Sequence, residues 1–364
     1  MNFAVIFIGL GVVALVAAIY FVTRFHKFSI CRRIEKKSKL LAWLAAFVPV
    51  IGMGILAYFS TFTTIVIILH LFIIWLIADL IGYIIKKITK KTWKVYWQGI
   101  GAILFFLAYI TGGYYVAHNV METDYTIEAV NEGEKVGEKL RIAMIADAHI
   151  SATFDGEGFA KHVKTIQETE PDLLVIVGDF VVDDSKRVDM EKACAALGEL
   201  KTKYGVYFVF GNHDRGYFTY RDFTATDLVE ELEKNGVTIL EDEIVPIGEK
   251  YQLIGRQDKS RSRADIATLM TWADLSKYSI VLDHQPNDFE AESKTSADLV
   301  LTGHTHGGWL FPMAYISSRI GPDDRIYGME KRNNTNFIVT SGISDWNLPI
   351  KTGTKSEFVI IDLE

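Results

Sequence analysis

The chain has 364 residues and a formal net charge of −7, and 49% of its residues are hydrophobic. That length allows about two ordinary domains, and the apolar content excludes a disordered chain. Two cysteines are too few for a disulfide scaffold. An isoelectric point near 5.8 argues against a nucleic-acid-binding protein, so no nucleic acid partner is expected.

Charge is distributed unevenly along the chain. Residues 1–120 contain 12 Lys and Arg but only two acidic residues, whereas the remainder contains 26 basic and 43 acidic residues. A basic and apolar beginning followed by an acidic remainder predicts a membrane part joined to a water-soluble part.

Uncharged runs in the basic part predict four membrane-spanning helices. Residues 2–22 are long enough to cross one hydrocarbon core. The uncharged run 40–78 is nearly twice that length, so we expect it to fold back at the Ser- and Thr-rich segment 60–64. The fourth span is expected over 95–116, which Trp and Tyr residues flank at its two ends. The start lacks the basic region of a signal peptide, so we expect the first helix to be retained.

Basic loops set the expected orientation. Residues 24–39 carry seven Lys and Arg, and residues 86–94 carry five Lys. Such loops lie in the cytoplasm, which places the acidic part outside it. Asp79 lies within the third span near the basic end, where we expect a structural role. Cys31 and Cys194 would then lie on opposite sides of the membrane and serve as packing residues.

The acidic part alternates between short apolar runs and amphipathic segments. Strands are expected at 141–146, 173–177, 206–210, 237–240, 251–255, 279–282, 298–302, 336–340 and 357–362. Helices are expected at 157–169, 186–199 and 225–235. This order predicts a layered α/β sandwich. The expected domains are a membrane anchor over 1–117, a linker over 118–139 and a soluble domain over 140–364.

Polar side chains gather directly after the expected strands. Five of the six histidines in residues 121–364 stand there. The candidate residues are Asp147, His149, Asp179, Asn212, His213, Asp214, His284, His304 and His306. One such histidine would be explained by packing, but this set indicates divalent metal ions at the C-terminal edge of the sheets. Seven ligands exceed the needs of one tetrahedral ion and suit two ions that share a carboxylate, an arrangement typical of hydrolysis at phosphorus.

These motifs occur in a recognisable order: Asp-X-His, Gly-Asp, Gly-Asn-His-Asp, His and Gly-His-X-His. Over residues 140–310, and more weakly to 362, the chain resembles the calcineurin-like metallophosphoesterase superfamily. The Gly-His-Thr-His-Gly-Gly run and the stretch from Ser341 to Pro349 resemble a membrane-anchored bacterial branch related to UDP-diacylglucosamine pyrophosphatases and small phosphodiesterases. The resemblance implies a four-layer α/β/β/α sandwich, a location in a bacterial cell membrane, and a two-metal phosphohydrolase.

The resemblance also implies individual roles. The ligands of one metal would be Asp147, His149 and His306, and those of the other Asn212, His284 and His304. Asp179 would bridge the two ions, and a bridging hydroxide would attack phosphorus. His213 would protonate the leaving oxygen, and Asp214 would orient His213. Manganese, iron, zinc, magnesium and nickel all remain open as the metal.

Three features depart from the pattern or add to it. Val182 occupies a position where the family often has an acid, and Asp183 and Asp184 follow it. The apolar run 309–316 favours core packing, with a wall for a lipid chain as the alternative. The basic residues within 256–263 favour a solvated loop, with a second phosphate site as the alternative.

Other functions compete with a phosphoester or diphosphate hydrolase. A non-catalytic metal-binding scaffold would be expected to lack ligands, yet all seven are present. A membrane sensor or transporter finds little support in four spans with one embedded acid. A zinc peptidase is disfavoured because no His-Glu-X-X-His occurs. Membrane lipid is an expected partner, and a lipid-linked substrate is left open, although an outward-facing site argues against a cytoplasmic nucleotide-linked lipid.

Overall fold

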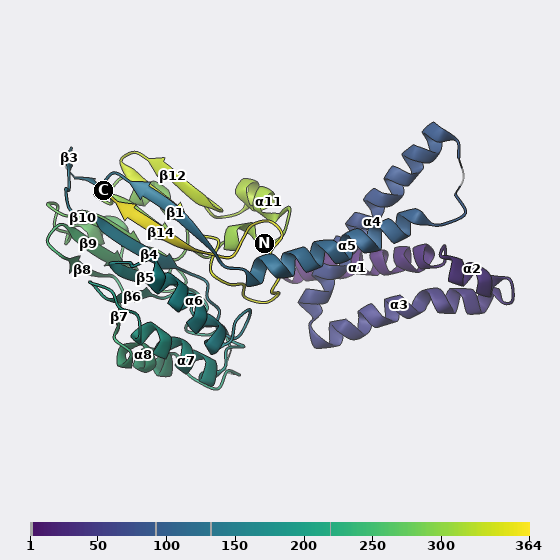
Figure 1. Cartoon of the computed structure of the whole chain (residues 1–364), viewed down its shortest axis with the longest axis horizontal. Helices are drawn as coiled ribbons and strands as arrows, with labels where there is room; N and C mark the ends of the chain where they lie inside the picture. The colour runs from purple at the N-terminus through teal and green to yellow at the C-terminus, as the bar shows by residue number, and fades with distance from the viewer. Residues whose placement is uncertain (1–2, 92, 132, 219) are drawn as a thin grey trace. The chain divides into compact units, whose positions relative to one another are not determined.

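The computed structural model describes residues 3–91, 93–131, 133–218 and 220–364. The chain divides into two compact units with the boundary between Gly112 and Gly113 (Figure 1). Asn2, at the start of the expected first span, and Glu132, within the expected linker, lie outside the described residues.

The first unit is helical. Its helices are α1 (Phe3–Phe25), α2 (Ser29–Glu35), α3 (Lys39–Phe59), α4 (Thr61–Thr89) and the greater part of α5 (Trp97–His118). Three of them, α3 to α5, are long and apolar enough to cross a membrane. A fourth crossing is counted only if α1 and α2, which are bent by 71° at a short break, form one broken span. The predicted four spans agree with the upper count in number, but the predicted first span ends at residue 22 and does not include α2.

The expected turn over 60–64 is much shorter than predicted. Helix α3 ends at Phe59 and α4 begins at Thr61, so Ser60 alone connects them. Its hydroxyl oxygen accepts the backbone N–H of Thr63 at 3.3 Å. Serine is favoured at this N-cap position because its oxygen satisfies an otherwise unpaired amide. The threonines that suggested a longer turn therefore lie inside the first turn of α4.

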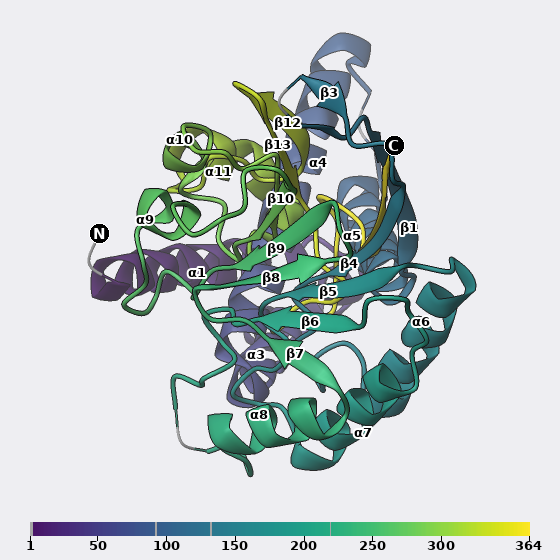
Figure 2. The same ribbon diagram turned by 90° about the vertical axis from the view of Figure 1, so that its left-hand side faces the viewer.

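The second unit contains two six-stranded sheets. The first has the order β1-β14-β4-β5-β6-β7 and the second the order β12-β13-β11-β10-β9-β8 (Figure 2). The strands of the first sheet are β1 (Met121–Ile127), β4 (Leu140–Ile145), β5 (Leu173–Val177), β6 (Val206–Val209), β7 (Val237–Ile239) and β14 (Glu357–Leu363). Those of the second are β8 (Glu243–Ile247), β9 (Tyr251–Gly255), β10 (Tyr278–Leu282), β11 (Leu299–Thr302), β12 (Gly328–Arg332) and β13 (Thr335–Val339).

Helices cover the outer faces of the two sheets. The first sheet carries α6 (Gly156–Glu168), α7 (Arg187–Gly198) and α8 (Ala225–Lys234), and the second carries α9 (Ile266–Met270) and α10 (Phe289–Glu292). Alternation along β4 builds this layering, since Ala143 and Ile145 face the helices while Ile142 and Met144 face the second sheet. The described residues thus form the predicted four-layer α/β/β/α sandwich. Cys31 and Cys194 are both buried and free, as expected.

The segment expected as a linker differs in its first part. Residues 121–127 form β1, which runs parallel to β14 from the pair Met121–Glu357 to the pair Ile127–Leu363. A short hairpin of β2 (Val130–Asn131) and β3 (Glu134–Lys135) follows. In β1 only Ile127 is buried, because an edge strand exposes most of its side chains. Because most residues of β1 are polar or exposed, the sequence pattern did not predict a strand there.

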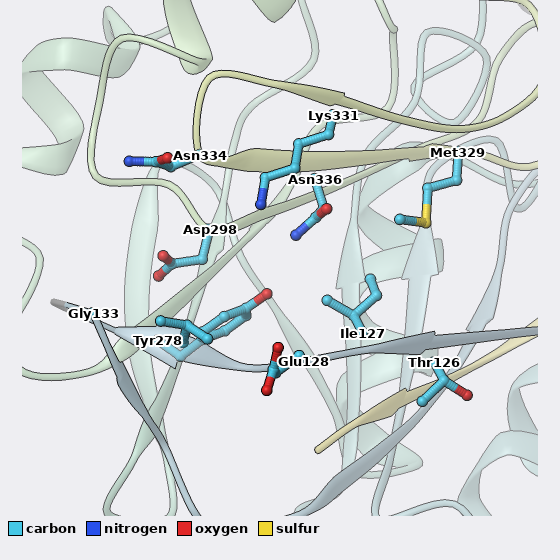
Figure 3. A pocket seen from close by; sticks show the side chains of 11 residues that line it. Thr126, Ile127, Glu128, Gly133, Tyr278, Asp298, Met329, Lys331, Asn334 and Asn336 are labelled. Atoms are coloured by element: carbon cyan, nitrogen blue, oxygen red, sulfur yellow. The ribbon is translucent and has the colours of Figure 1, made fainter.

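A cavity of about 590 Å³ lies between the end of β1 and the N-terminal ends of β10 and β13 in the second sheet (Figure 3). Tyr278 begins β10 and Asp298 precedes β11, and both line it. Burial raises the pKa of Asp298 to about 6. The candidate metal ligands follow the same strands at their other ends, so this cavity is separate from them.

Candidate metal centre

The C-terminal ends of the two sheets supply the candidate ligands. In the first sheet, Asp147 follows β4, Asp179 follows β5 and Asn212 follows β6. In the second sheet, His284 follows β10, and His304 and His306 follow β11. The structure gathers six of the predicted ligands into two groups, Asp147 with His149 and His306, and Asp179 with His284 and His304.

The first group has closely spaced donor atoms. The Nε2 atoms of His149 and His306 lie 3.3 Å apart, and His306 Nε2 lies 3.7 Å from an oxygen of Asp147. All three side chains are buried. Burial holds the pKa of His149 well below its ordinary value, so its ring is neutral and has a lone pair to offer.

The second group is fixed by a backbone contact. The Nδ1 atom of His284 donates to the carbonyl oxygen of Val177 at 2.8 Å, which leaves Nε2 for another partner. That Nε2 atom lies 3.2 Å from Asp179 Oδ2, and the same oxygen lies 3.8 Å from His149 Nε2. Burial alone raises the pKa of Asp179, but attraction to His284 holds it well below its ordinary value. Asp179 is therefore an anionic carboxylate between the two groups.

Unsatisfied buried atoms test whether these residues fit metal ions. Within the described part of the chain, the buried Oδ1 atom of Asn212 has no hydrogen-bond partner. Buried polar atoms are normally paired, so Asn212 Oδ1 calls for another partner. Amide oxygen, carboxylate and imidazole together suit divalent ions. The residues therefore fit two such ions, with Asp179 positioned to contact both.

Backbone strain concentrates at the ligands. Five of the candidate ligands have a positive φ, between 38° and 69°: Asp147, His149, Asp179, His304 and His306. This conformation is uncommon for residues other than glycine and costs free energy. It turns the chain sharply at each strand end and directs these side chains into one space. The surrounding sheets must supply the compensating stability.

Neighbouring glycines leave room for the ligands. A Cβ atom at Gly178 would lie 2.4 Å from the ring of His284, and one at Gly211 would lie 2.2 Å from Asp179 Oδ1. The absence of side chains at these two glycines thus makes room for the ligand side chains.

His213 and Asp214 differ in how well they match their expected roles. The ring of His213 is half-buried and lies 5.3 Å from that of His149, beside the two groups. The carboxylate of Asp214 instead accepts the backbone amides of Asp179, Val181 and Gly211 at 2.7 to 3.0 Å. The expectation that Asp214 orients the ring of His213 is therefore wrong, because its oxygens hold together the loops after β5 and β6.

Several residues around the centre were not among the predicted site residues. An oxygen of Asp345 lies 3.4 Å from His306 Nδ1, and Asp345 is buried. The hydroxyl of Tyr217 accepts a hydrogen bond from Asn212 Nδ2 at 3.0 Å. The ring of Trp346 stacks at 6.0 Å from that of His213. These residues lie in loops, whose sequences have no hydrophobic periodicity from which their position could be predicted.

The two acidic residues that follow Val182 differ in burial. Asp183 is buried and accepts the backbone amides of Tyr217 and Phe218, both at 2.9 Å. Asp184 is exposed. Asp183 therefore supports the loop that carries Tyr217, one residue later than the family pattern suggests.

Two of the basic residues within 256–263 do not form a phosphate site. Arg256 is buried and pairs with Asp283 at 2.7 Å and with Glu292 at 3.0 Å. Arg263 also pairs with Asp283, at 2.9 Å. These guanidinium groups are engaged by acids after β10 and in α10, which the sequence could not place beside them. The alternative of a second phosphate site is therefore wrong for both arginines.

The apolar run 309–316, which follows β11, is only partly packed. Leu310 is buried, whereas Phe311 is 64% exposed and Tyr315 is 62% exposed. Helix α11 (Met313–Ile320) has no buried residue. The expectation of core packing is therefore wrong for most of this run.

The geometry predicts that the substitution Gly211→Ala strongly lowers the affinity for metal ions. Gly211 does not need a positive φ, so the new methyl group acts through its contact with Asp179. We expect the affinity for Mn²⁺ to fall about 10- to 100-fold, measured by titration of the metal-free chain. Gly101→Ala, whose Cβ would meet nothing within 4 Å, should bind as the wild type does. Equal affinities of the two variants would contradict the placement of Asp179.

Comparison with known proteins agrees with this geometry. Residues 140–308 match the family model of calcineurin-like phosphoesterases. An uncharacterized metallophosphoesterase of Helicobacter pylori strain J99 is 28% identical over 274 residues, covering 72% of this chain and 70% of that protein. A zebrafish transmembrane protein with a metallophosphoesterase domain is 27% identical over 241 residues, covering 62% and 53% respectively. A dimetal phosphatase structure from zebrafish aligns with a TM-score of 0.39 and 11% identity, covering 58% and 88%.

Residues 140–308 therefore belong to the calcineurin-like phosphoesterase family, and the chain carries a metal-dependent phosphoesterase domain that uses two divalent metal ions.

Proposed function

We propose that the chain is a membrane-anchored phosphohydrolase that cleaves a phosphoester or diphosphate with His213 as the proton donor. The observation that carries the proposal is the position of Asp179, whose Oδ2 lies 3.2 Å from one histidine group and 3.8 Å from the other. A carboxylate shared in this way suits two ions that act on one substrate.

In the proposed reaction, the ligand residues hold the metal ions and His213 supplies the proton. Two divalent ions, when bound, supply Lewis acidity toward the phosphoryl oxygens and lower the pKa of water. His213 stands beside the ligand groups with its backbone N–H bonded to Asp179 Oδ1 at 2.8 Å, which fixes where its side chain begins. Its half-buried ring donates a proton to the leaving oxygen. The rings of Tyr217 and Trp346 confine that of His213 at 5.1 Å and 6.0 Å.

His213→Ala tests this assignment. With bis-(p-nitrophenyl) phosphate and Mn²⁺, we expect kcat of the full-length chain to fall about 10²- to 10⁴-fold, because a positioned proton donor is lost. Bound metal, measured by atomic absorption, should remain as in the wild type, since His213 is not among the gathered ligands.

Asp179→Asn is the matched comparison, because it removes the shared charge and should lower both metal content and turnover. A wild-type protein that binds two ions but hydrolyses neither this diester nor p-nitrophenyl phosphate would favour the non-catalytic scaffold. Full activity of the His213 variant would move the proton donor to another group.

The anchoring part of the proposal concerns helices α1 to α5. Apolar length supports three or four crossings, and the zebrafish relative is named as a transmembrane protein. With four crossings, the basic segments 24–39 and 86–94 lie in the cytoplasm and the phosphoesterase domain lies outside it, in a bacterial cell membrane.

Reporter fusions test this orientation. An alkaline phosphatase fused after Gly137 should be active, because that enzyme folds outside the cytoplasm, whereas a fusion within 30–38 should be inactive. The reverse pattern would place the domain in the cytoplasm.

A lipid-linked substrate is supported by the apolar surface beside the centre. The ring of Trp309 lies 6.2 Å from that of Trp346, which in turn faces His213. Exposed Phe311 and Met313 continue this surface from Trp309 into α11. A surface of this kind gains free energy when an acyl or prenyl chain covers it.

The double variant Phe311→Gln with Met313→Gln tests that surface. We expect kcat/KM for a prenyl diphosphate in mixed micelles to fall about tenfold, because two apolar contacts are lost. Turnover of bis-(p-nitrophenyl) phosphate should not change. Trp272→Gln, at a residue that is 68% exposed and lies between α9 and β10, is the control. Equal losses on both substrates would indicate packing instead.

A further inference from the structure

A second cavity lies wholly within the first unit. It has a volume of about 460 Å³ and is bounded by α1, α2, α4 and the segment that precedes α5. Five cationic side chains and one carboxylate line it: Arg24, Lys27, Arg32, Lys86, Lys91 and Asp79. The two basic segments of the sequence, far apart along the chain, thus meet around one hollow.

The single carboxylate is already engaged. Asp79 accepts hydrogen bonds from the hydroxyls of Tyr20 and Tyr96, both at 2.8 Å, and pairs with Arg24. Tyr96 also accepts the indole N–H of Trp75 at 2.9 Å, within a buried aromatic cluster. Asp79 therefore ties α1, α4 and the segment before α5 together, which agrees with its expected structural role. Its single negative charge is matched by that of Arg24, so it cannot also neutralise the four other cations.

Those four cations have no acidic partner. Across the described residues of the first unit, no ion pair joins Lys27, Arg32, Lys86 or Lys91 to a carboxylate. Lys27 is half-buried and lies 5.2 Å above the ring of Tyr96. Like charges held around one hollow repel each other, and a bound anion would relieve that repulsion. Orientation in the membrane would explain basic loops, but it does not require them to converge on a cavity.

The rim of the cavity is apolar and exposed. Tyr83, Trp93 and Val95 line it and are 63%, 59% and 62% exposed. Tyr and Trp are typical of the boundary between hydrocarbon and headgroups. Cationic side chains beside these aromatic and apolar side chains match a phospholipid, which carries its phosphate next to acyl chains. A free anion would not need the rim.

We propose that this cavity binds the phosphate of an anionic phospholipid headgroup. Arg32 offers a planar fork that suits phosphate oxygens, and the lysines supply further charge. The inference depends on insertion of the first unit in a membrane but not on the metal centre. It gives the anchor a lipid preference of its own.

Titration of the full-length chain in a neutral detergent tests the proposal. Dihexanoyl phosphatidylglycerol should bind saturably, as measured by calorimetry, while zwitterionic dihexanoyl phosphatidylcholine should not. The variants Arg32→Gln with Lys86→Gln, and Lys27→Gln with Lys91→Gln, should each bind about tenfold more weakly, because two cations near the headgroup are lost. The control, Lys36→Gln with Lys37→Gln, removes two exposed charges that do not line the cavity.

The outcomes separate the possible explanations. Weaker binding in the cavity variants alone, with unchanged melting temperatures, supports the site. Equal weakening in the control would indicate general surface charge and overturn it. Saturable binding of inorganic phosphate without binding of phosphatidylglycerol would assign the cavity to a free anion and overturn the lipid headgroup. None of these measurements uses hydrolysis, so failure here leaves the phosphohydrolase proposal untouched.

Discussion

The buried charge of Asp179 is the constraint on which the phosphoesterase domain depends. Removing a carboxylate from water costs several kcal/mol unless other groups compensate it. Here the compensation comes from both sheets: His284 from the second, and the backbone N–H of His213 from the first. The two sheets must therefore keep their mutual position if the charge is to stay satisfied. The core between them, formed by alternate residues of β4, β5, β10 and β11, maintains that position.

The same constraint explains the unusual backbone at the site. Loops that end in positive φ at five ligands would relax if they were free, so the network beneath them matters. Around Asp179, Asp214 supplies it by accepting three amides from the loops after β5 and β6. Burial, together with the charge of Asp179, raises the pKa of Asp214 to about 7 in the metal-free protein. Asp214 and Asp179 thus share one buried environment, and positive charge placed beside Asp179 stabilises both.

Sequence patterns were most informative where one physical requirement dominated. Central strands such as β5 and β10 are buried on both faces, so their apolar runs were recognisable, and the ligands followed directly from the strand ends. The sequence did not predict three edge strands, because β1 and β12 carry polar residues and β8 contains Pro246. Asp345 and Trp346 reach the centre through a loop whose path no periodicity records. Arg256 and Arg263 were misread because the acids that pair with them lie 20 to 36 residues away in sequence.

Two sites for phosphate chemistry in one chain differ in how their charges are held. At the metal centre the donors are buried, strained and tightly spaced, which suits a precise geometry and limits screening by salt. In the cavity of the first unit, Arg32, Lys86 and Lys91 are exposed, and Arg24 and Lys27 are half-buried. Salt screens such charges over about 8 to 10 Å at physiological ionic strength. A lipid held there exchanges readily with its neighbours, which suits an anchor, whereas a substrate at the metal centre is held in one orientation, which suits a reaction.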